Sequence, residues 1–238
     1  MKQLVLLVIV VFIFAVQRTH AESIDREHEI DFSVDLYSKH LWRGFSNGNS
    51  VSIQPAIEYS YSGFATGAWA AVSVDGSYYE LDLYVAYTLG SFSVTFYDYF
   101  CPVKPLADNE FFEIQQRKTK HTFDLNVEYS QPDKHPFALT VATMIYGDDL
   151  NPENGKNYFS TYIEPSYNAT FYTLNVKAFA GLTPFESYYS QSAAFVNIGA
   201  GLARKFPIVK KFDVEAKIKL AYNPSINKGW ISFGIGIQ

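Results

Sequence analysis

The 238-residue sequence has a single cysteine, Cys101, and fewer basic residues than acidic ones, 19 against 24. A lone cysteine excludes a disulfide within the chain, and the formal net charge of −5 argues against nucleic acid as a partner. No histidine has metal-ligand spacing to another histidine or to Cys101, so no metal and no cofactor is predicted. Beyond residue 21 the sequence also lacks any long stretch of helical periodicity, which argues against a helical fold.

The one long apolar run, Leu4–Val16, follows Lys2 and precedes Thr19-His20-Ala21. A basic start, an apolar segment and a small residue at the cleavage position are typical of a secretory signal peptide. The run is shorter than the roughly 20 residues that cross a bilayer as a helix. We therefore expect residues 1–21 to be a signal peptide that is removed, and residues 22–238 to form one domain.

The rest of the sequence is dominated by alternation of apolar and polar side chains. In Ser77–Gly90 the apolar residues Leu81, Leu83, Val85 and Tyr87 alternate with polar positions that include Glu80 and Asp82. Successive side chains of a strand point to opposite faces, so this stretch predicts a strand with one apolar and one charged face. The aromatic content of 17% also favours strands.

The same pattern predicts an all-β fold of about twelve antiparallel strands. The predicted strands are Ile30–Arg43, Val51–Tyr61, Phe64–Val74, Tyr78–Thr88, Phe92–Phe100, His121–Ser130, Phe137–Tyr146, Tyr158–Asn168, Phe171–Leu182, Ala193–Phe206, Lys211–Asn223 and Gly229–Gln238. Most have close to the roughly 9–11 residues that cross a membrane as a tilted strand.

The connections between these strands alternate in length. Short turns follow the even-numbered strands: Ser62-Gly63, Leu89–Ser91, Gln131–Pro136, Ala169-Thr170 and Pro207–Lys210. Longer loops follow most odd-numbered strands: Gly44–Ser50, Cys101–Lys120, Gly147–Asn157 and Thr183–Ser192. Asp75–Ser77 is an exception and predicts a tight hairpin with Asp75-Gly76 as its turn. Short turns at one end and long loops at the other are typical of a single outer-membrane β-barrel.

Aromatic residues flank each short turn on the apolar face of the strands. They are Tyr61, Phe64, Tyr87, Phe92, Tyr129, Phe137, Tyr167, Tyr172, Phe206 and Phe212. Such a ring is typical of a membrane–water interface. A second ring at the long-loop end would comprise Trp42, Tyr99, Tyr146, Tyr158 and Trp230. A secreted β-sandwich or a soluble barrel with an apolar interior would alternate equally well.

If the apolar face contacts lipid, the polar face lines the lumen. The predicted pore-lining residues are Asp35, Lys39, Arg43, Glu58, Glu80, Asp82, Asp124, Glu128, Lys177, Asp213, Glu215, Lys217 and Lys219. Charges of both signs can select ions, or they can pair with one another and fill the interior. Twelve strands lie between the small barrels whose interior is filled and the large barrels that hold an aqueous channel. The longest loop, Cys101–Lys120, is a candidate constriction, a lipid contact or a solvated loop.

Evidence for catalysis is sparse, and we expect no enzyme. Ser38 and His40 lie on one face of the first predicted strand, which would suit a lipid hydrolase at the barrel rim. Outer-membrane phospholipases carry the histidine before the serine and an asparagine directly after it. Here the order is reversed, and Lys39 separates the two residues.

Three blocks of the sequence resemble a known family: Asp35–Phe45, Gln54–Trp69 and Glu80–Tyr87. They are similar to the TorF-type porins, a family of largely uncharacterised bacterial outer-membrane β-barrel proteins. The matching positions are Tyr37, Trp42, Arg43, Gly44, Gln54, Pro55, Glu80, Asp82 and Tyr84. The resemblance implies an outer-membrane location and a channel-like role. One departure is the final residue, Gln238, because outer-membrane barrels commonly end in an aromatic residue.

From the alternation, the loop lengths and the lumenal charges, we expect a barrel in the outer membrane of a Gram-negative bacterium. Its expected role is a porin-like channel for passive diffusion of small polar solutes or ions, with outer-membrane lipids as its other partners. The first alternative is a non-conducting barrel that serves as an anchor or adhesion scaffold, and the second is the rim hydrolase. Pairing of Arg43 with a carboxylate across the lumen would favour the non-conducting barrel.

Overall fold

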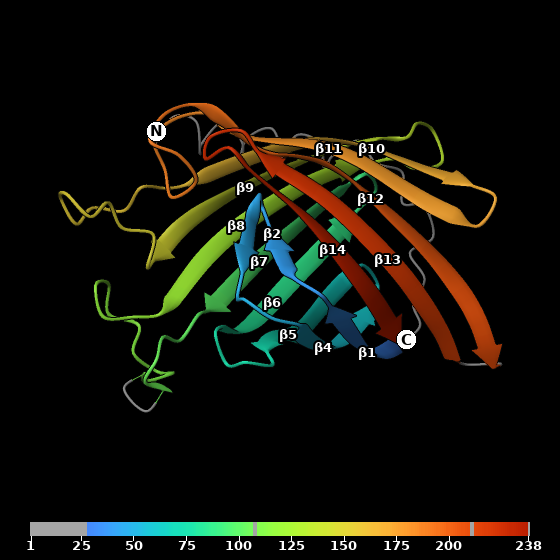
Figure 1. The fold of residues 1–238 in the computed structure, drawn as a ribbon, viewed down its shortest axis with the longest axis horizontal. Helices are drawn as coiled ribbons and strands as arrows, with labels where there is room; N and C mark the ends of the chain where they lie inside the picture. Colours follow the sequence, from blue (N-terminus) through green and yellow to red (C-terminus); the bar gives the residue numbers. More distant parts are fainter. Residues whose placement is uncertain (1–27, 107–108, 210–211, 238) are drawn as a thin grey trace.

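A computed structural model describes residues 28–106, 109–209 and 212–237. Within these residues twelve strands form a closed antiparallel barrel (Figure 1), which confirms the predicted fold class. The predicted signal peptide, residues 1–21, lies outside the described residues. In the part of the chain that is described, no helix is long and apolar enough to cross a membrane.

The barrel strands have bounds close to the predicted ones. They are β1 (His28–Tyr37), β4 (Ser52–Tyr61), β5 (Phe64–Ser73), β6 (Tyr79–Leu89), β7 (Phe92–Phe100), β8 (His121–Ser130), β9 (Phe137–Gly147), β10 (Thr161–Phe171), β11 (Leu174–Thr183), β12 (Ala194–Val209), β13 (Phe212–Asn223) and β14 (Lys228–Ile237). From β4 to β14 each strand pairs with its neighbours in sequence, and β1 closes the barrel between β4 and β14. Among the described residues, β1 pairs with β4 along its whole length and with β14 over Val34–Tyr37.

Tight turns join the strands at one end of the barrel, on the right in Figure 1, and longer loops lie at the other. Ser62 and Gly63, between β4 and β5, have φ angles of 51° and 83°. Positive φ at both central residues defines the two-residue turn whose twist matches a hairpin. The predicted exception between β5 and β6 is confirmed, because Asp75 Oδ1 accepts a hydrogen bond from Ser77 N at 3.0 Å and Gly76 has a φ of 67°.

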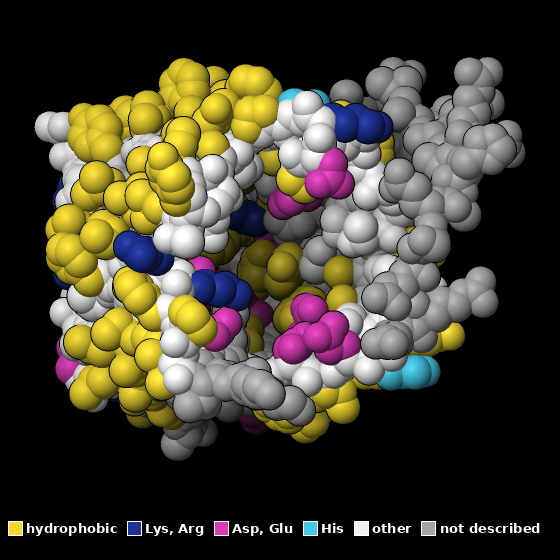
Figure 2. Space-filling model, turned by 90° about the vertical axis from the view of Figure 1, so that its right-hand side faces the viewer, with side chains coloured by type: hydrophobic (Ala, Val, Ile, Leu, Met, Phe, Trp, Pro, Cys, Tyr) yellow, Lys and Arg dark blue, Asp and Glu magenta, His cyan; other side chains and the backbone are white. Residues whose placement is uncertain are grey.

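The apolar face of the strands points outward. On β6, Leu83 and Val85 are each 41% exposed, whereas Glu80 and Asp82 are each only 7% exposed. In the view from the short-turn end, apolar side chains cover the left and upper parts of the outer wall, beside a central hollow (Figure 2). Aromatic residues predicted near the short turns are exposed: Tyr61, Phe64, Tyr87, Phe92, Phe137, Tyr167, Tyr172 and Phe206. An apolar wall around a polar interior is the reverse of a soluble barrel with an apolar core and is consistent with a membrane barrel.

Several local predictions are wrong, among them the turn Pro207–Lys210, because β12 continues to Val209. The first strand ends at Tyr37 instead of Arg43, because the chain turns into the lumen after this residue. Trp42 and Tyr99 do not join a ring on the outer wall, since both side chains line a cavity inside the barrel. The turn between β10 and β11 lies at Tyr172-Thr173 instead of Ala169-Thr170, because β10 continues to Phe171.

Candidate functional site

A second, two-stranded sheet lies inside the barrel (Figure 1). It consists of β2 (His40–Trp42) and β3 (Phe45–Asn47), which pair antiparallel and are called the inner hairpin below. Arg43 and Gly44 form its turn with φ angles of 43° and 85°. The segment between β1 and β4 therefore contains a regular hairpin with a two-residue turn.

The tip of the inner hairpin is bound to the far wall of the barrel. Arg43 Nη1 donates to Asp124 Oδ2 at 2.7 Å, and Arg43 Nη2 donates to Asn126 Oδ1 at 3.0 Å. Both acceptors lie on β8, which stands across the closed strand order from β1 and β4. Arg43 Nη1 also donates to Tyr189 OH, in the loop between β11 and β12, at 2.6 Å. The inner hairpin thus spans the lumen, and a buried ion pair holds its end.

The turn also fits tightly against β12 and β13. A Cβ atom at Gly44 would lie 1.8 Å from the carbonyl oxygen of Val196, which is closer than any side chain permits. Asn223 Nδ2 donates to the Gly44 carbonyl at 3.1 Å. Both the positive φ and this close approach therefore require glycine at position 44.

The base of the inner hairpin is fixed to the walls beside it. Lys39 N donates to Ser232 Oγ at 3.3 Å, and Ser232 Oγ donates to the Lys39 carbonyl at 2.6 Å. Gln54 Nε2 lies 3.0 Å from His40 Nδ1, and His40 Nε2 lies 3.3 Å from Glu80 Oε2. These contacts join the hairpin to β14, β4 and β6.

Aromatic side chains fill the long-loop side of the lumen around the inner hairpin. The Trp42 ring packs against Tyr99 and Tyr189, each at 6.0 Å between ring centroids. Tyr189 is 2% exposed and belongs to a buried cluster with Met144 and Val196. The interior at this end is therefore packed like a protein core.

Among the described residues, a cavity lies on each side of the inner hairpin. The larger, about 920 Å³, lies along β10–β14 and the short turns, and the smaller, about 420 Å³, lies along β4–β7. Among the described residues that line the larger cavity, cations outnumber acids: the cations are Lys39, Lys134, Lys177, Lys217 and Lys219, and the acids are Asp133 and Glu164. The smaller is lined by three acids and no lysine or arginine: Glu58, Glu80 and Asp82. His40 touches both cavities, so the hairpin separates a basic space from an acidic one.

The structure brings several of the predicted lumenal residues together. Lys217 Nζ lies 2.8 Å from Asp35 Oδ1 and 3.2 Å from Glu215 Oε2. Lys219 Nζ donates to the carbonyl of Leu41 at 3.2 Å. These contacts link β13 to β1 and to the inner hairpin.

Two other predicted residues, Lys177 and Glu58, bind side chains that are not among the predicted pore-lining residues. Lys177 Nζ lies 2.8 Å from Glu164 Oε1 on β10, and Tyr84 OH donates to Glu58 Oε2 at 2.6 Å. Glu128 is exposed and Asp213 is half-buried, both near the short turns. Glu164 alternates in phase with the inward-facing Tyr162 and Ser166 along β10, so the same pattern could have predicted Glu164 as a lumenal residue.

Ser38 and His40 have separate partners. Phe233 N donates to Ser38 Oγ at 2.9 Å, while the His40 ring faces Gln54 and Glu80. Across the described ranges, no group of three or more His, Cys, Asp or Glu side chains is placed to hold a metal ion.

Comparison with known proteins assigns no family to this chain. No protein-family model matches the chain, and no curated protein sequence is significantly similar to it. The resemblance to TorF-type porins therefore rests on the three sequence blocks alone. The molecule is a closed twelve-stranded antiparallel barrel with an exposed apolar surface.

Proposed function

We propose that this protein is an outer-membrane β-barrel of a Gram-negative bacterium that forms a narrow, porin-like channel for small polar solutes or ions. The inner hairpin is the constriction of this channel. The observation that carries the proposal is the pair of oppositely charged cavities on either side of the hairpin. Charged walls that face a hydrated space are what selective pores use.

The membrane location is supported by the outer wall. Exposed apolar side chains recur on the outer face of strands from both ends of the chain, including Phe32, Val85 and Phe233. Soluble proteins rarely expose apolar surface continuously over all strands, because its transfer to water is unfavourable. Outer-membrane lipids are therefore the proposed partner of this wall, and the resemblance to TorF-type porins agrees with this location.

Passive diffusion is supported by lumenal polar and charged groups that the protein leaves without a full set of partners. Among the described residues, Lys219 forms a hydrogen bond to a carbonyl but no ion pair. The buried Oδ1 of Asp82 has no hydrogen-bond partner within the same residues. A cation without an ion pair and a buried polar atom without a hydrogen bond are both costly in a dry interior, so these groups favour an interior that holds water or ions.

One observation favours the second candidate, a non-conducting barrel that acts as an anchor or adhesion scaffold. The Arg43–Asp124 pair and the packed Trp42 side chain close the long-loop side of the lumen. A channel would then require the inner hairpin to move.

Two experiments test the proposal. The unheated full chain should migrate differently from the heated chain on a denaturing gel, and it should fractionate with outer membranes. In planar lipid bilayers the folded protein should give small, ion-selective current steps. A folded barrel that gives no current at any applied voltage would overturn the channel and leave the scaffold as the function.

A further inference from the structure

The wall of the larger cavity contains two lysines placed on either side of a glycine. Lys177 on β11 and Lys219 on β13 both pair in register with Gly201 on β12, which lies between them. A Cβ atom at Gly201 would meet nothing closer than the Ile218 carbonyl at 3.8 Å. The glycine therefore leaves an open space between the two lysines. Because neighbouring strands lie about 4.8 Å apart, the backbones of β11 and β13 are about 10 Å apart on either side of β12.

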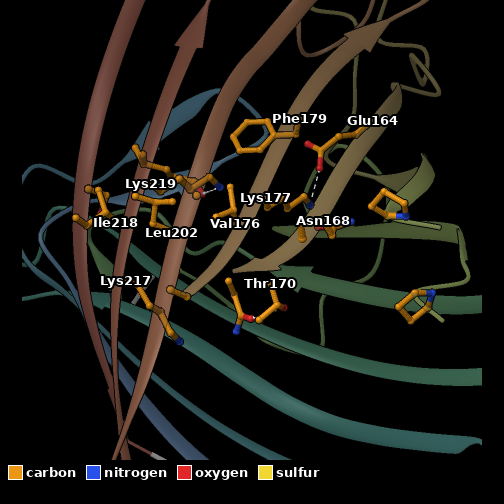
Figure 3. A pocket seen from close by; sticks show the side chains of 18 of the residues that line it. Glu164, Asn168, Thr170, Val176, Lys177, Phe179, Leu202, Lys217, Ile218 and Lys219 are labelled. Carbon is orange, nitrogen blue, oxygen red and sulfur yellow. Dashed lines mark hydrogen bonds and ion pairs between the residues drawn. The ribbon is translucent and has the colours of Figure 1, made fainter. Parts of the chain in front are cut away.

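Both ammonium groups lie near the same aromatic ring. Lys177 Nζ is 5.8 Å and Lys219 Nζ is 5.6 Å from the centre of the Phe179 ring. Figure 3 shows the two lysines flanking Phe179 in the cavity. Phe179 is 7% exposed, so the ring holds a fixed position against which both side chains are arranged.

Positive charge exceeds negative charge in this part of the cavity. Glu164 is the nearby acid, and its carboxylate is already paired with Lys177 at 2.8 Å. Among the described residues, neither the Lys219 nor the Lys39 ammonium group has an ion pair. Lys219 donates to a backbone carbonyl, and Ser232 contacts only the backbone of Lys39. Uncompensated cations that face the same space attract an anion.

The remaining wall is polar and has room for a solute larger than an inorganic ion. Asn168, Thr170 and Asn175 supply amide and hydroxyl groups on β10 and β11. The volume of about 920 Å³ falls within the range of about 300–1,000 Å³ that is typical of small-molecule sites. The cavity walls therefore combine cations, which suit the charged group of an anionic solute, with hydrogen-bonding groups, which suit the polar remainder of that solute.

We propose that the larger cavity binds a small organic anion of the size of a sugar acid, which enters from the short-turn end. Its carboxylate lies over Gly201 between Lys177 and Lys219, and its polar body lies against the amides and hydroxyls of β10 and β11. Charge-assisted hydrogen bonds from two ammonium groups are the strong contacts of this site. The site does not require the barrel to conduct, so it goes beyond the proposed channel.

The test measures equilibrium binding of glucuronate to the detergent-solubilised full chain by titration calorimetry, with glucose as the uncharged control. Glucuronate should bind and glucose should not. Lys219→Met should weaken glucuronate binding by about tenfold or more, because a charge-assisted hydrogen bond is lost. Lys219→Arg should retain most of the affinity. Lys228→Met removes one charge at an exposed position near the long loops and should leave binding unchanged.

Gly201→Leu provides an independent variant, because it fills the space between the lysines and keeps every charge. It should abolish binding, while heat-modifiable gel migration confirms that each variant is folded. Equal binding of glucose and glucuronate, or unchanged binding by folded Lys219→Met, would overturn the site. Binding without any bilayer current would sustain this site and overturn the channel, so the two proposals fail separately.

Discussion

Replacing Arg43 with methionine is expected to release the tip of the inner hairpin from the far wall. The variant loses the 2.7 Å ion pair with Asp124 and the hydrogen bonds to Tyr189 and Asn126. Methionine retains most of the apolar stem of the side chain, so the change removes mainly the charge and the donors. Asp124, whose side chain is fully buried, is then left without its cation.

The size of the effect follows from burial. Breaking a buried ion pair by removing one partner costs about 3–5 kcal/mol. Each 1.4 kcal/mol is about a factor of ten in an equilibrium. The population of barrels with an undocked hairpin should therefore rise by at least about a hundredfold. Asp124→Asn combined with Arg43→Met should cost less than the sum of the two single changes, because no unpaired charge remains.

The assay is single-channel recording in planar bilayers. Arg43→Met should give larger or more frequent openings than the unmodified protein, because the hairpin leaves the lumen more often. Arg117→Met, which removes the same charge from an exposed loop, is the matched control and should behave like the unmodified protein. Unchanged conductance in a folded Arg43→Met barrel would refute the assignment of the hairpin as the constriction.

Three further changes have defined outcomes. Gly44→Ala should increase conductance as Arg43→Met does, because its Cβ would collide with Val196; unchanged recordings would contradict this. Charge reversal at Glu80 and Asp82 should shift the reversal potential in a salt gradient towards anions, and an unaltered potential would mean that they only brace the wall. Burial raises the pKa of the Asp149 carboxyl group, which lies in the loop between β9 and β10. The folded protein therefore binds a proton at Asp149 more tightly than the unfolded chain does, and it loses stability as the pH rises through the raised pKa. The thermal unfolding temperature of Asp149→Asn should therefore fall less between acidic and neutral pH than that of the unmodified protein, and equal slopes would reject this.

Alternation was sufficient to predict the barrel because the period of two is imposed on every strand by the backbone. β6 illustrates this, since Leu83 and Val85 face outward and Glu80 and Asp82 face inward. Residue types that favour tight hairpins also predicted the turns at Ser62-Gly63 and Asp75-Gly76. Where the sequence around a turn was uniformly polar and aromatic, as at Tyr172, the pattern misplaced the turn.

The inner hairpin was not predictable from the same pattern. Alternation continues from β1 through His40 and Trp42, so periodicity does not reveal that the chain leaves the wall after Tyr37. The Arg43-Gly44 pair is a usable turn signal, but the alternation predicts Arg43 as the last residue of the first strand and Gly44 as the start of a loop. The position of Tyr189 in the lumen was not predictable from the sequence, because a loop residue is not part of a periodic pattern.

The contacts at the hairpin tip also constrain the order in which the protein folds. Arg43 binds Asp124 and Tyr189, which lie 81 and 146 residues further along the chain, and Gly44 binds Asn223, which is 179 residues away. Contacts between such distant residues form slowly, because the entropy of closing long loops must be lost first. The tip can acquire its partners only after β8 and β13 have reached their places in the wall. Although it belongs to the first part of the barrel to be synthesised, the inner hairpin is therefore among the last parts to become native.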